Sequence, residues 1–365
     1  MAVKKAILIS FNGKSSAGGV ERIVYFLDEY FRRKGIPSKI IDEQYLIHHT
    51  LFGRLFQQLF RYRHFKKRKT IYLACYASAF LWWYKRSSHV VISQGESVPF
   101  YPVDFAYLHG SYHCMEIAYG RTDPRLSRIA ALQQRSCLIA KQVIAVTTQV
   151  KQDLIDYYQV PSDKIVVLDN CVDTARFAPV EKKPGTRRTL LFVGRLVREK
   201  GLPALQQLAG IIAKSDNWQL LIACNESPDT AFFADIPHTI VKTGLSIDNI
   251  AAEAYGMADL LILPSLFESF GLVVLEALSM GVPVIGTDVG AIVELGKRHF
   301  PGVYRLPELA YDDPEMLVYF DNIVTAFNES AASKTLHQQV AAEFDMEGYY
   351  KKLDAIMAPA FAHKS

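Results

Sequence analysis

The sequence predicts an α/β protein built from two doubly wound domains, each a parallel sheet with helices on both faces. The chain has 365 residues, more than one core usually holds at about 150 residues per domain. Short apolar runs alternate with longer amphipathic stretches almost from end to end. This is the pattern of buried parallel strands joined by crossover helices. The alternation breaks once, at residues 179–185, and then starts again.

That break predicts the domain boundary. Residues 179–185 contain two prolines, one glycine and three charged residues, a composition typical of a linker. We therefore expect domains at 1–178 and 179–344, with a C-terminal helix at about 345–365 that can pack back on the first. Two α/β halves of this kind would face a central ligand cleft at the carboxyl ends of their strands.

The individual elements follow from the spacing of apolar residues. In the first domain we expect strands at 5–10, 38–42, 70–74, 89–93, 104–108, 142–146 and 165–168, and helices at 20–34, 125–140 and 148–158. In the second we expect strands at 189–194, 219–223, 239–243, 260–264 and 283–287, and helices at 202–214, 248–257, 271–281 and 313–331. The last twenty residues also have a helical pattern.

Composition and charge exclude several classes of protein. The net charge of +4 is too small to indicate nucleic acid, and no nucleic-acid-binding module is recognisable. No secretory leader and no run of 18 apolar residues occurs, so we expect a cytoplasmic protein without a membrane span. No C-x-x-C pair occurs, which favours free thiols over a zinc site or disulfides. The five cysteines are Cys75, Cys114, Cys137, Cys171 and Cys224.

The most informative stretch is residues 264–278, which follow an apolar strand and open a helix. A helix N-terminus offers unpaired N–H groups and partial positive charge to a phosphate, and Gly271 removes a side chain where a ligand would approach. Glu268 precedes the helix. Glu276 lies on an otherwise apolar helix face, where an unpaired carboxylate is costly. A capping and a surface glutamate would give the same spacing, so the pattern alone leaves both roles open.

A basic loop follows the first strand after the linker. Gly194 and Gly201 bracket Arg195, Arg198 and Lys200. Arginine binds phosphate through forked hydrogen bonds and lysine binds it as a point charge. The loop therefore predicts a diphosphate site, although a basic loop taken alone is more often solvated surface.

Together the two stretches resemble the GT-B-fold retaining glycosyltransferases of family 4. That family pairs an E-x7-E motif, here Glu268 to Glu276, with an upstream G-R-x-x-x-x-K-G loop, here residues 194–201. The run 170–179 also resembles the family's N-x-x-D-x-x-x-F-x-P sequence. Residues 290–291, Gly-Ala, depart from the glycine pair of many members. The resemblance implies two Rossmann-like domains facing a central cleft.

The resemblance also implies a role for each matched residue. Arg195 and Lys200 would bind the donor's diphosphate and stabilise it as it leaves. Glu276 would hold the ribose hydroxyls, and Glu268 would contact hydroxyls of the donor sugar. The backbone N–H groups that would reach the sugar or the phosphate belong to Phe270, Gly271, Leu272 and Val273.

Two features of the first domain match the family's site more loosely. Gly18 and Gly19 follow the first strand and open a helix, where the backbone can approach a phosphate or an acceptor. His109 ends another strand, and the resemblance makes it a polar contact near the reacting carbon. A strand-end histidine is otherwise more often a structural hydrogen bonder. Glu96 and His113 are weaker candidates nearby.

Residues 51–69 contain seven Lys or Arg and no acid, with Leu and Phe at helical spacing. A basic amphipathic helix can lie on an anionic membrane face, and the family's frequent lipid-linked acceptors favour this. A core-facing apolar stripe with a solvated basic face explains the pattern equally well. Both interpretations remain open.

The resemblance implies transfer of a hexose from a nucleotide-diphosphate sugar to a glycan or lipid-linked acceptor, with retention of configuration. The donor phosphate would accept the acceptor's proton, and no dedicated nucleophile is evident. No Asp-x-Asp occurs, so neither a metal nor another cofactor is expected. UDP-hexose is the expected donor, ahead of GDP-mannose; the identity of the hexose depends on a few hydrogen bonds. Bacterial lipopolysaccharide, O-antigen or capsule synthesis, at the inner face of the cell membrane, is the expected setting.

Two other functions fit the same fold. One is a nucleotide-sugar epimerase or phosphorylase, which would use the same cleft without this E-x7-E setting. The other is a catalytically silent partner subunit that binds nucleotide-sugar or glycan. The intact Glu268, Glu276, Arg195 and Lys200 argue against a silent subunit.

Overall fold

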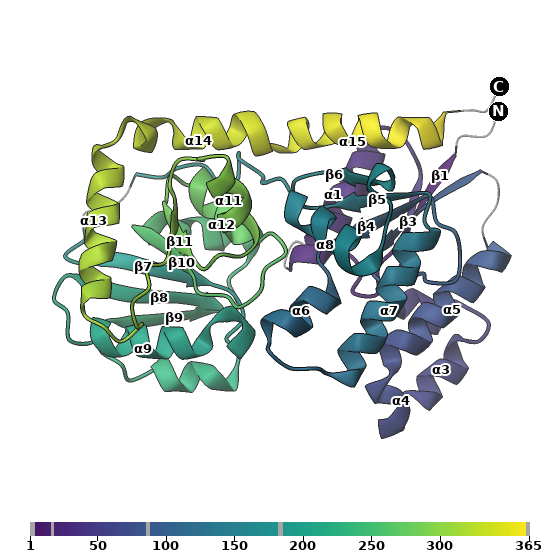
Figure 1. The fold of residues 1–365 in the computed structure, drawn as a ribbon, viewed down its shortest axis with the longest axis horizontal. Coiled ribbons are helices and arrows are strands. Elements are labelled where there is room, and N and C mark those ends of the chain that lie inside the picture. The colour runs from purple at the N-terminus through teal and green to yellow at the C-terminus, as the bar shows by residue number, and fades with distance from the viewer. Residues whose placement is uncertain (1–3, 16–17, 85–87, 182–184, 363–365) are drawn as a thin grey trace. The chain divides into compact units, whose positions relative to one another are not determined.

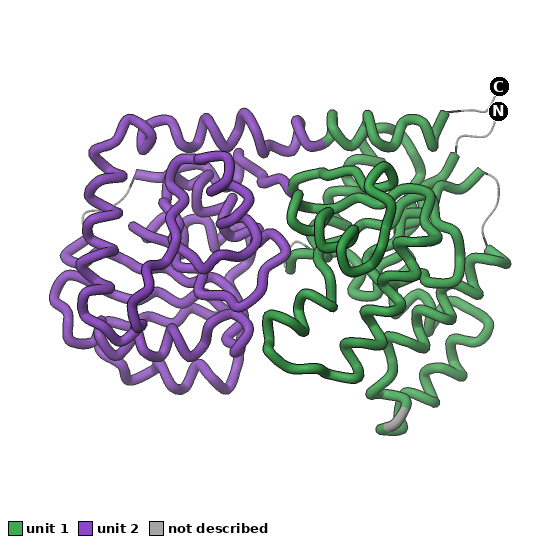
Figure 2. The backbone as a smooth tube through the Cα atoms, in the orientation of Figure 1, with its two compact units in different colours: residues 1–169, 350–365 green, residues 170–349 purple. Residues whose placement is uncertain are grey.

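The computed structural model of the protein describes residues 4–15, 18–84, 88–181 and 185–362. Its backbone divides into two compact units, unit 1 (residues 1–169 and 350–365) and unit 2 (residues 170–349) (Figure 2). Residues 182–184 of the expected linker and residues 16–17 before the glycine pair lie outside the described residues.

The division falls before Asn170, upstream of the expected 178/179 boundary. Two contacts inside unit 2 explain this position. Val172 forms a parallel bridge with Asp345, and the ring of Phe177 meets the edge of Tyr255 at 5.6 Å. The segment that resembles the family's N-x-x-D-x-x-x-F-x-P run is therefore part of the packing of unit 2.

Unit 1 contains a parallel six-stranded sheet in the order β2-β1-β3-β4-β5-β6 (Figure 1). Its strands are β1 (Lys5–Ile9), β2 (Ser38–Ile41), β3 (His89–Gln94), β4 (Phe105–Leu108), β5 (Gln142–Ala145) and β6 (Ile165–Val167). The expected helices appear as α1 (Gly19–Arg33), α7 (Pro124–Ile139) and α8 (Thr148–Tyr158). Strand β4 is buried at every position, as a continuous apolar run between covered faces requires.

The strand expected at 70–74 is wrong, because these residues lie inside helix α5 (Lys69–Tyr84). The apolar run continues well past the length of a strand. Its buried residues Leu73, Ala77 and Leu81 recur at intervals of four, which is helical spacing. A short apolar window cannot distinguish a buried strand from a buried helix, and here the length of the run decides.

Residues 51–69 do not form the single helix that their pattern indicates. They form α3 (Gly53–Leu59) and α4 (Arg63–Lys67), with a turn between them. Both helices pack on α5: Phe56 stacks on Tyr76 with ring centroids 4.6 Å apart, and Phe65 lies 5.3 Å from Tyr72. The turn lets each short helix bring one aromatic ring to the same neighbour.

Unit 2 contains a second parallel six-stranded sheet, in the order β12-β11-β10-β7-β8-β9. Its strands are β7 (Arg188–Val193), β8 (Trp218–Cys224), β9 (Thr239–Thr243), β10 (Leu260–Leu263), β11 (Val284–Gly286) and β12 (Val303–Arg305). Its helices are α9 (Leu202–Ile212), α10 (Ile247–Glu253), α11 (Leu272–Ser279), α12 (Gly290–Lys297), α13 (Glu315–Glu329) and α14 (Ala331–Phe344). Counted along unit 2, the strand order is that of dinucleotide-binding sheets.

The last helix, α15 (Met346–Phe361), belongs to unit 1 from Tyr350 onward. There it packs on α1: the Tyr30 hydroxyl donates to Asp354 at 2.8 Å, and the Arg33 guanidinium lies 5.1 Å from the centre of the Tyr350 ring. Two six-stranded parallel sheets with covering helices confirm the predicted α/β class. No helix among the described residues is both long enough and apolar enough to cross a membrane.

Candidate functional site

The strand order of unit 2 brings the two informative sequence stretches together. Strands β7 and β10 are neighbours, and the order reverses between them, since β8 and β9 lie on one side and β11 and β12 on the other. Loops that leave a sheet at such a point diverge and leave a ligand-binding crevice at the carboxyl ends of the strands. The basic loop 194–201 follows β7, and residues 264–271 follow β10.

Direct backbone contacts join these two loops. The N–H of Leu266 donates to the carbonyl of Glu199 at 2.9 Å. A Cβ on Gly201 would lie 2.3 Å from the carbonyl oxygen of Pro264, and Gly201 has a φ of +87°. Both facts require glycine at this position. The second glycine of the basic loop thus permits close packing of the two loops.

Lys200 and Glu268, which the resemblance assigns to the diphosphate and the sugar, are paired with each other. The Lys200 ammonium lies 2.5 Å from Oε1 of Glu268, and the two side chains are 26% and 10% exposed. The Ser265 hydroxyl donates to the same carboxylate oxygen at 3.1 Å. The pair holds both charged groups at the end of β10 with partial access to solvent.

Arg195 lies in the same loop, with an exposed side chain. It forms no hydrogen bond or ion pair with another described side chain. A cation of this kind is available to an anionic ligand at little desolvation cost. The structure thus places Arg195, Lys200 and Glu268 on loops that touch, at one edge of the unit 2 sheet.

The N-terminus of α11 lies at the end of the same loop. Gly271 precedes the helix with φ +87°, and among the described residues no side chain caps it. The N–H groups of Leu272 and Val273 have no hydrogen-bond acceptor within the described chain. The Phe270 side chain is buried at 2% exposure. The Phe270 side chain therefore leaves room for a ligand at the backbone, as an anion site at a helix N-terminus requires.

Glu276 is buried at 2% exposure, and the Tyr255 hydroxyl donates to its Oε2 at 2.5 Å. This bond shows how the apolar face of α11 tolerates a carboxylate, since a buried charge needs hydrogen-bond donors. Glu276 lies inside α11, the helix that begins after Gly271. Contact with a ribose stays a prediction.

Two residues of this region received no role in the sequence interpretation. Thr287 follows β11, and its hydroxyl donates to the carbonyl of Ser265 at 2.5 Å. A Cβ on Gly290 would lie 2.5 Å from the carbonyl oxygen of Phe270. The Thr and Gly that follow a short strand were the available signal. They hold the Glu268 loop from the side of β11.

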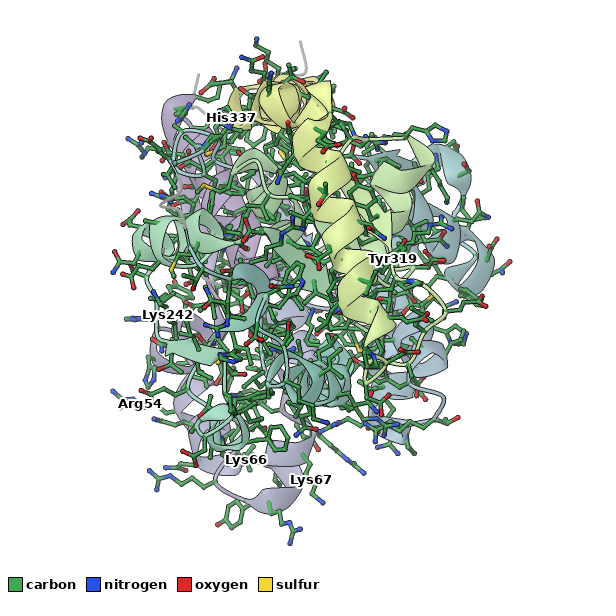
Figure 3. All side chains as sticks on the ribbon, turned by 90° about the vertical axis from the view of Figure 1, so that its left-hand side faces the viewer. Arg54, Lys66, Lys67, Lys242, Tyr319 and His337 are labelled. Carbon is green, nitrogen blue, oxygen red and sulfur yellow. The ribbon has the colours of Figure 1, made fainter. Side chains whose placement is uncertain are left out.

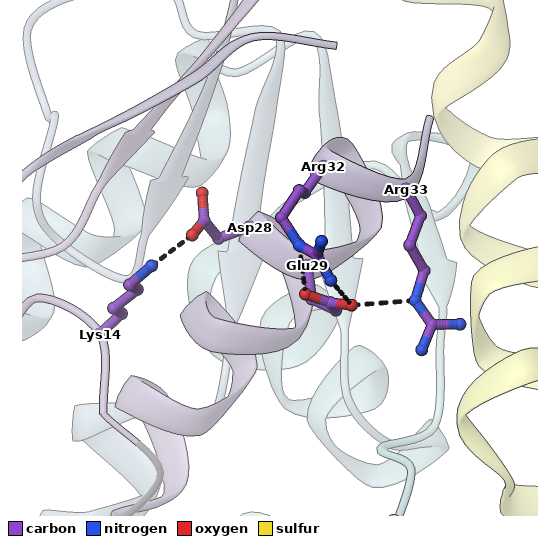
Figure 4. A network of polar contacts seen from close by, with 5 residues as sticks. All are labelled: Lys14, Asp28, Glu29, Arg32 and Arg33. Atoms are coloured by element: carbon purple, nitrogen blue, oxygen red, sulfur yellow. Dashed lines mark hydrogen bonds and ion pairs between the residues drawn. The ribbon is translucent and has the colours of Figure 1, made fainter. Parts of the chain in front are cut away.

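In unit 1 the strand order reverses between β1 and β3, and the predicted residues lie at the carboxyl ends of β1, β3 and β4. Gly18 has φ +90° and caps α1 without a side chain. Lys14 of the preceding loop pairs with Asp28 of α1 at 2.5 Å (Figure 4). On the same helix Arg32 and Arg33 bind Glu29, and the Arg32 hydrogen bond lowers the pKa of that carboxyl. One end of the glycine loop is thus tied to its helix.

His109 follows β4 and is held by a residue that the sequence interpretation missed. Its Nε2 lies 2.7 Å from Oε1 of Gln94, the last residue of β3. Burial lowers the pKa of His109 to about 3, so the imidazole is neutral at physiological pH. Gln94 precedes the candidate Glu96, and a polar residue at a strand end was the available signal.

The two weaker candidates lie near the same edge. Tyr112, the first residue of helix α6 (Tyr112–Ala118), donates from its hydroxyl to Glu96 at 3.4 Å. Burial raises the pKa of Glu96. The ring of His113 lies 4.6 Å from that of Tyr157 on α8. His113 also lines a cavity of about 570 Å³ between α6, α7 and α8. Among the described residues, no group of three His, Cys, Asp or Glu side chains could hold a metal ion.

Both halves of the chain match families of known proteins. A family described as "Glycosyl transferases group 1" matches residues 187–317, which include the basic loop and the E-x7-E motif. A family described as "Glycosyltransferase Family 4" matches residues 17–176, which include the glycine pair, Gln94 and His109.

Individual relatives align with about half of the chain. An uncharacterized glycosyltransferase of Methanocaldococcus jannaschii is 29% identical over 197 residues, which cover 49% of this chain and 50% of the relative. The lipopolysaccharide core biosynthesis mannosyltransferase LpsB of Rhizobium meliloti is 31% identical over 158 residues, 38% of this chain and 44% of the relative. The chain thus spans about half the length of the curated relatives it matches.

Solved structures match over nearly the whole chain. A sucrose-phosphate synthase of Thermosynechococcus elongatus superposes with a TM-score of 0.75 at 17% identity, covering 98% of this chain and 99% of that one. HepE of Anabaena, solved with UDP and glucose, superposes with a TM-score of 0.66 at 13% identity, covering 98% and 100%. These similarities establish the GT-B fold. With both halves matched, the chain belongs to the group 1, family 4 type of glycosyltransferases.

Proposed function

We propose that the protein is a retaining glycosyltransferase that moves a hexose from a nucleotide-diphosphate sugar to a glycan or lipid-linked acceptor. One observation carries the proposal: Arg195, Lys200 and the open N-terminus of α11 lie on touching loops at the switch point of the unit 2 sheet. Two cations and a helix N-terminus together suit a pyrophosphate better than a neutral ligand.

In this mechanism the bond between the anomeric carbon and the diphosphate oxygen breaks as positive charge grows on the sugar. Lys200, Arg195 and the N–H groups of Leu272 and Val273 would stabilise the negative charge on the departing phosphate. Charge stabilisation of this kind is usually the largest single contribution to catalysis. The acceptor hydroxyl attacks from the face that the diphosphate leaves, and its proton passes to a phosphate oxygen.

Glu268 has two roles in the proposal. It holds Lys200 before the donor arrives, so that little reorganisation is needed when phosphate binds. It also keeps acceptor oxygens free for hydroxyls of the donor sugar, because a carboxylate can accept several hydrogen bonds. Glu276 and the glycine pair of unit 1 are proposed contacts to the ribose and to the donor or acceptor.

UDP-hexose is the proposed donor, with GDP-mannose as the alternative. HepE was solved with UDP and glucose, and LpsB is a mannosyltransferase of lipopolysaccharide core biosynthesis. The similarity to LpsB also supports a setting in bacterial surface polysaccharide synthesis. A thermal-shift screen across nucleotide-sugars tests the donor, because a ligand at 100 times its Kd stabilises the fold by about 2.7 kcal/mol.

We expect turnover without a metal ion, because two cationic side chains and a helix N-terminus can neutralise the charge of the diphosphate themselves. Release of nucleoside diphosphate from the preferred donor should stay within about twofold of its normal rate in excess EDTA, whereas loss of a catalytic metal costs several kcal/mol of transition-state stabilisation. Activity that disappears with EDTA and returns with Mg²⁺ or Mn²⁺ would contradict this. Tight donor binding without release would instead indicate a silent binding subunit.

The basic stretch 51–69 is proposed to hold the protein on an anionic membrane. Leu51, Phe52 and Leu55 are 88%, 56% and 53% exposed, so this end of α3 is no core-facing stripe. Arg54, Lys66 and Lys67 are exposed and lie at the surface of unit 1 (Figure 3). They form no ion pair with another described residue. Exposed apolar and unpaired basic side chains together are typical of interfacial helices.

Reversal of three charges, Arg54→Glu, Lys66→Glu and Lys67→Glu, should weaken binding to vesicles of phosphatidylglycerol and phosphatidylcholine at least about 100-fold, since each basic residue contributes about 1 kcal/mol. Co-sedimentation at several salt concentrations measures it. A control variant, Lys297→Glu, Lys334→Glu and Lys351→Glu, changes net charge equally at exposed positions outside the stretch. Equal loss in both variants would show that only net charge matters.

A further inference from the structure

One buried polar group at the edge of unit 1 has no explained role. Gln94 is 4% exposed, and its Nε2 has no hydrogen-bond partner in the described chain. A buried polar group without a hydrogen-bond partner is rare and calls for an explanation. Here the other atom, Oε1, lies 2.7 Å from Nε2 of His109.

We infer that Gln94 is a positioning residue that fixes His109 as the neutral tautomer with its proton on Nε2. An amide oxygen can only accept, so Nε2 must donate to it. The Nδ1 lone pair then stays available as an acceptor for a substrate hydroxyl. The bond to one ring nitrogen sets the tautomer presented at the other.

Backbone geometry fixes this pair. Gln94 and Tyr107 are partners in the parallel register of β3 and β4, which brings the strand ends carrying Gln94 and His109 side by side. The ring of Tyr107 stacks on His109 with centroids 5.0 Å apart and an angle of 18°. The carbonyl of Gln94 accepts from the N–H of Ser97 at 3.1 Å. The imidazole is thus held by a stacked ring on one side and an amide at its edge.

Among the described residues, no charged side chain competes with Gln94 for the imidazole. Glu96, two residues after Gln94, accepts from the Tyr112 hydroxyl. Asp104, five residues before His109, accepts from the N–H of Val91 and from the Lys141 ammonium. The end of β5, which lies beside β4, carries no titratable side chain from 142 to 147. Burial is the cause that lowers the pKa of His109. A neutral ring suits the proposed reaction, because an imidazolium would repel the positive charge that develops on the sugar.

The tautomer can be measured without any assay of transfer. In ¹⁵N-histidine-labelled protein, long-range ¹H–¹⁵N correlations distinguish a proton on Nε2 from one on Nδ1, and a His109→Asn variant assigns the signal among the ten histidines. We expect the Nε2–H form in the natural protein and a mixture of both forms in Gln94→Leu. A dominant Nδ1–H form, or no change in Gln94→Leu, overturns the inference.

The kinetic arm rests on the proposed function. We expect kcat to fall at least about tenfold in Gln94→Leu at every pH, since the wrong tautomer cannot offer the same acceptor. In Gln94→Glu the carboxylate still accepts from Nε2 but raises the pKa of His109 by about 1 to 3 units or more. The activity of Gln94→Glu should therefore rise with pH as His109 loses its proton, and fall as pH decreases. The natural protein should show no such pH dependence above the low pKa of its His109.

The surface variant Gln152→Leu removes an exposed amide that bonds Asp156 on α8 and controls for a general effect of losing glutamine. If Gln94→Leu loses activity while the tautomer of His109 stays unchanged, Gln94 has only a structural role and the inference is wrong. If no donor is turned over by the natural protein, the proposed function fails, and the tautomer measurement still decides the role of Gln94.

Discussion

Replacing Lys200 with alanine is expected to lower kcat by on the order of 10²- to 10³-fold, the cost of removing one group that stabilises charge in a transition state. Lys200 is the only one of the two predicted cations already held in place, by Glu268 at 2.5 Å. In the natural protein, the Lys200 ammonium would contact the departing phosphate, and the alanine variant loses this contact. The KM for the donor should rise much less, because the interaction strengthens as charge develops.

A matched lysine separates this effect from loss of an ion pair. Lys242 is also 26% exposed, also lies in unit 2, and pairs with Glu253 at 3.3 Å. Lys242→Ala should leave kcat within about twofold, because an exposed pair contributes roughly 1 kcal/mol or less to stability. Initial rates of nucleoside diphosphate release measure both variants. Equal losses in the two would remove the special role of Lys200.

Gly201→Ala is expected to destabilise unit 2 by about 2 to 4 kcal/mol and to displace the basic loop. The alanine would have to adopt φ +87° and would place its Cβ 2.3 Å from the carbonyl oxygen of Pro264. The left-handed conformation alone costs about 1 to 2 kcal/mol for a residue with a Cβ, and the backbone contact adds to it. Donor binding should weaken together with stability, since Lys200 is the neighbouring residue.

Gly210→Ala is the control for this substitution. Gly210 lies inside α9, with a negative φ and no atom within 4 Å of the added Cβ, so alanine there should stabilise by about 0.5 to 1 kcal/mol. Denaturation followed by the fluorescence of Trp218, in a background with Trp82→Phe and Trp83→Phe, reports on unit 2 alone. Equal stabilities of the two variants would show that the loop packing is looser than described.

Much of the fold could be predicted from the sequence, because in a doubly wound protein the apolar runs are continuous and their spacing is regular. Every expected strand of unit 2 is present. Strand β12 was missed because its three residues are half-buried or exposed and form no continuous apolar run. Helices α12 and α14 were missed as well. Helix α5 was misread in part as a strand, because a short apolar window of a buried helix, here residues 70–74, resembles a buried strand.

The site was predicted unevenly, for a physical reason. Arg195, Lys200 and Glu268 lie in loops whose residue types directly reflect a charged ligand, and adjacent strands bring those loops together. Gln94 and Thr287 act through hydrogen bonds to other side chains or to backbone. A polar residue at a strand end is only a weak signal for such a role, since the partner is distant in the chain and only the fold makes it a neighbour.

A crystal structure of the protein with its preferred nucleotide-sugar donor, or with the corresponding nucleoside diphosphate, tests the pyrophosphate site most directly. We predict that a phosphate oxygen lies about 3 Å from the Lys200 ammonium, and that others accept from Arg195 and from the N–H groups of Leu272 and Val273. A diphosphate bound at another edge of the unit 2 sheet, with Lys200 still paired to Glu268 and the N-terminus of α11 facing only solvent, would contradict the proposed function.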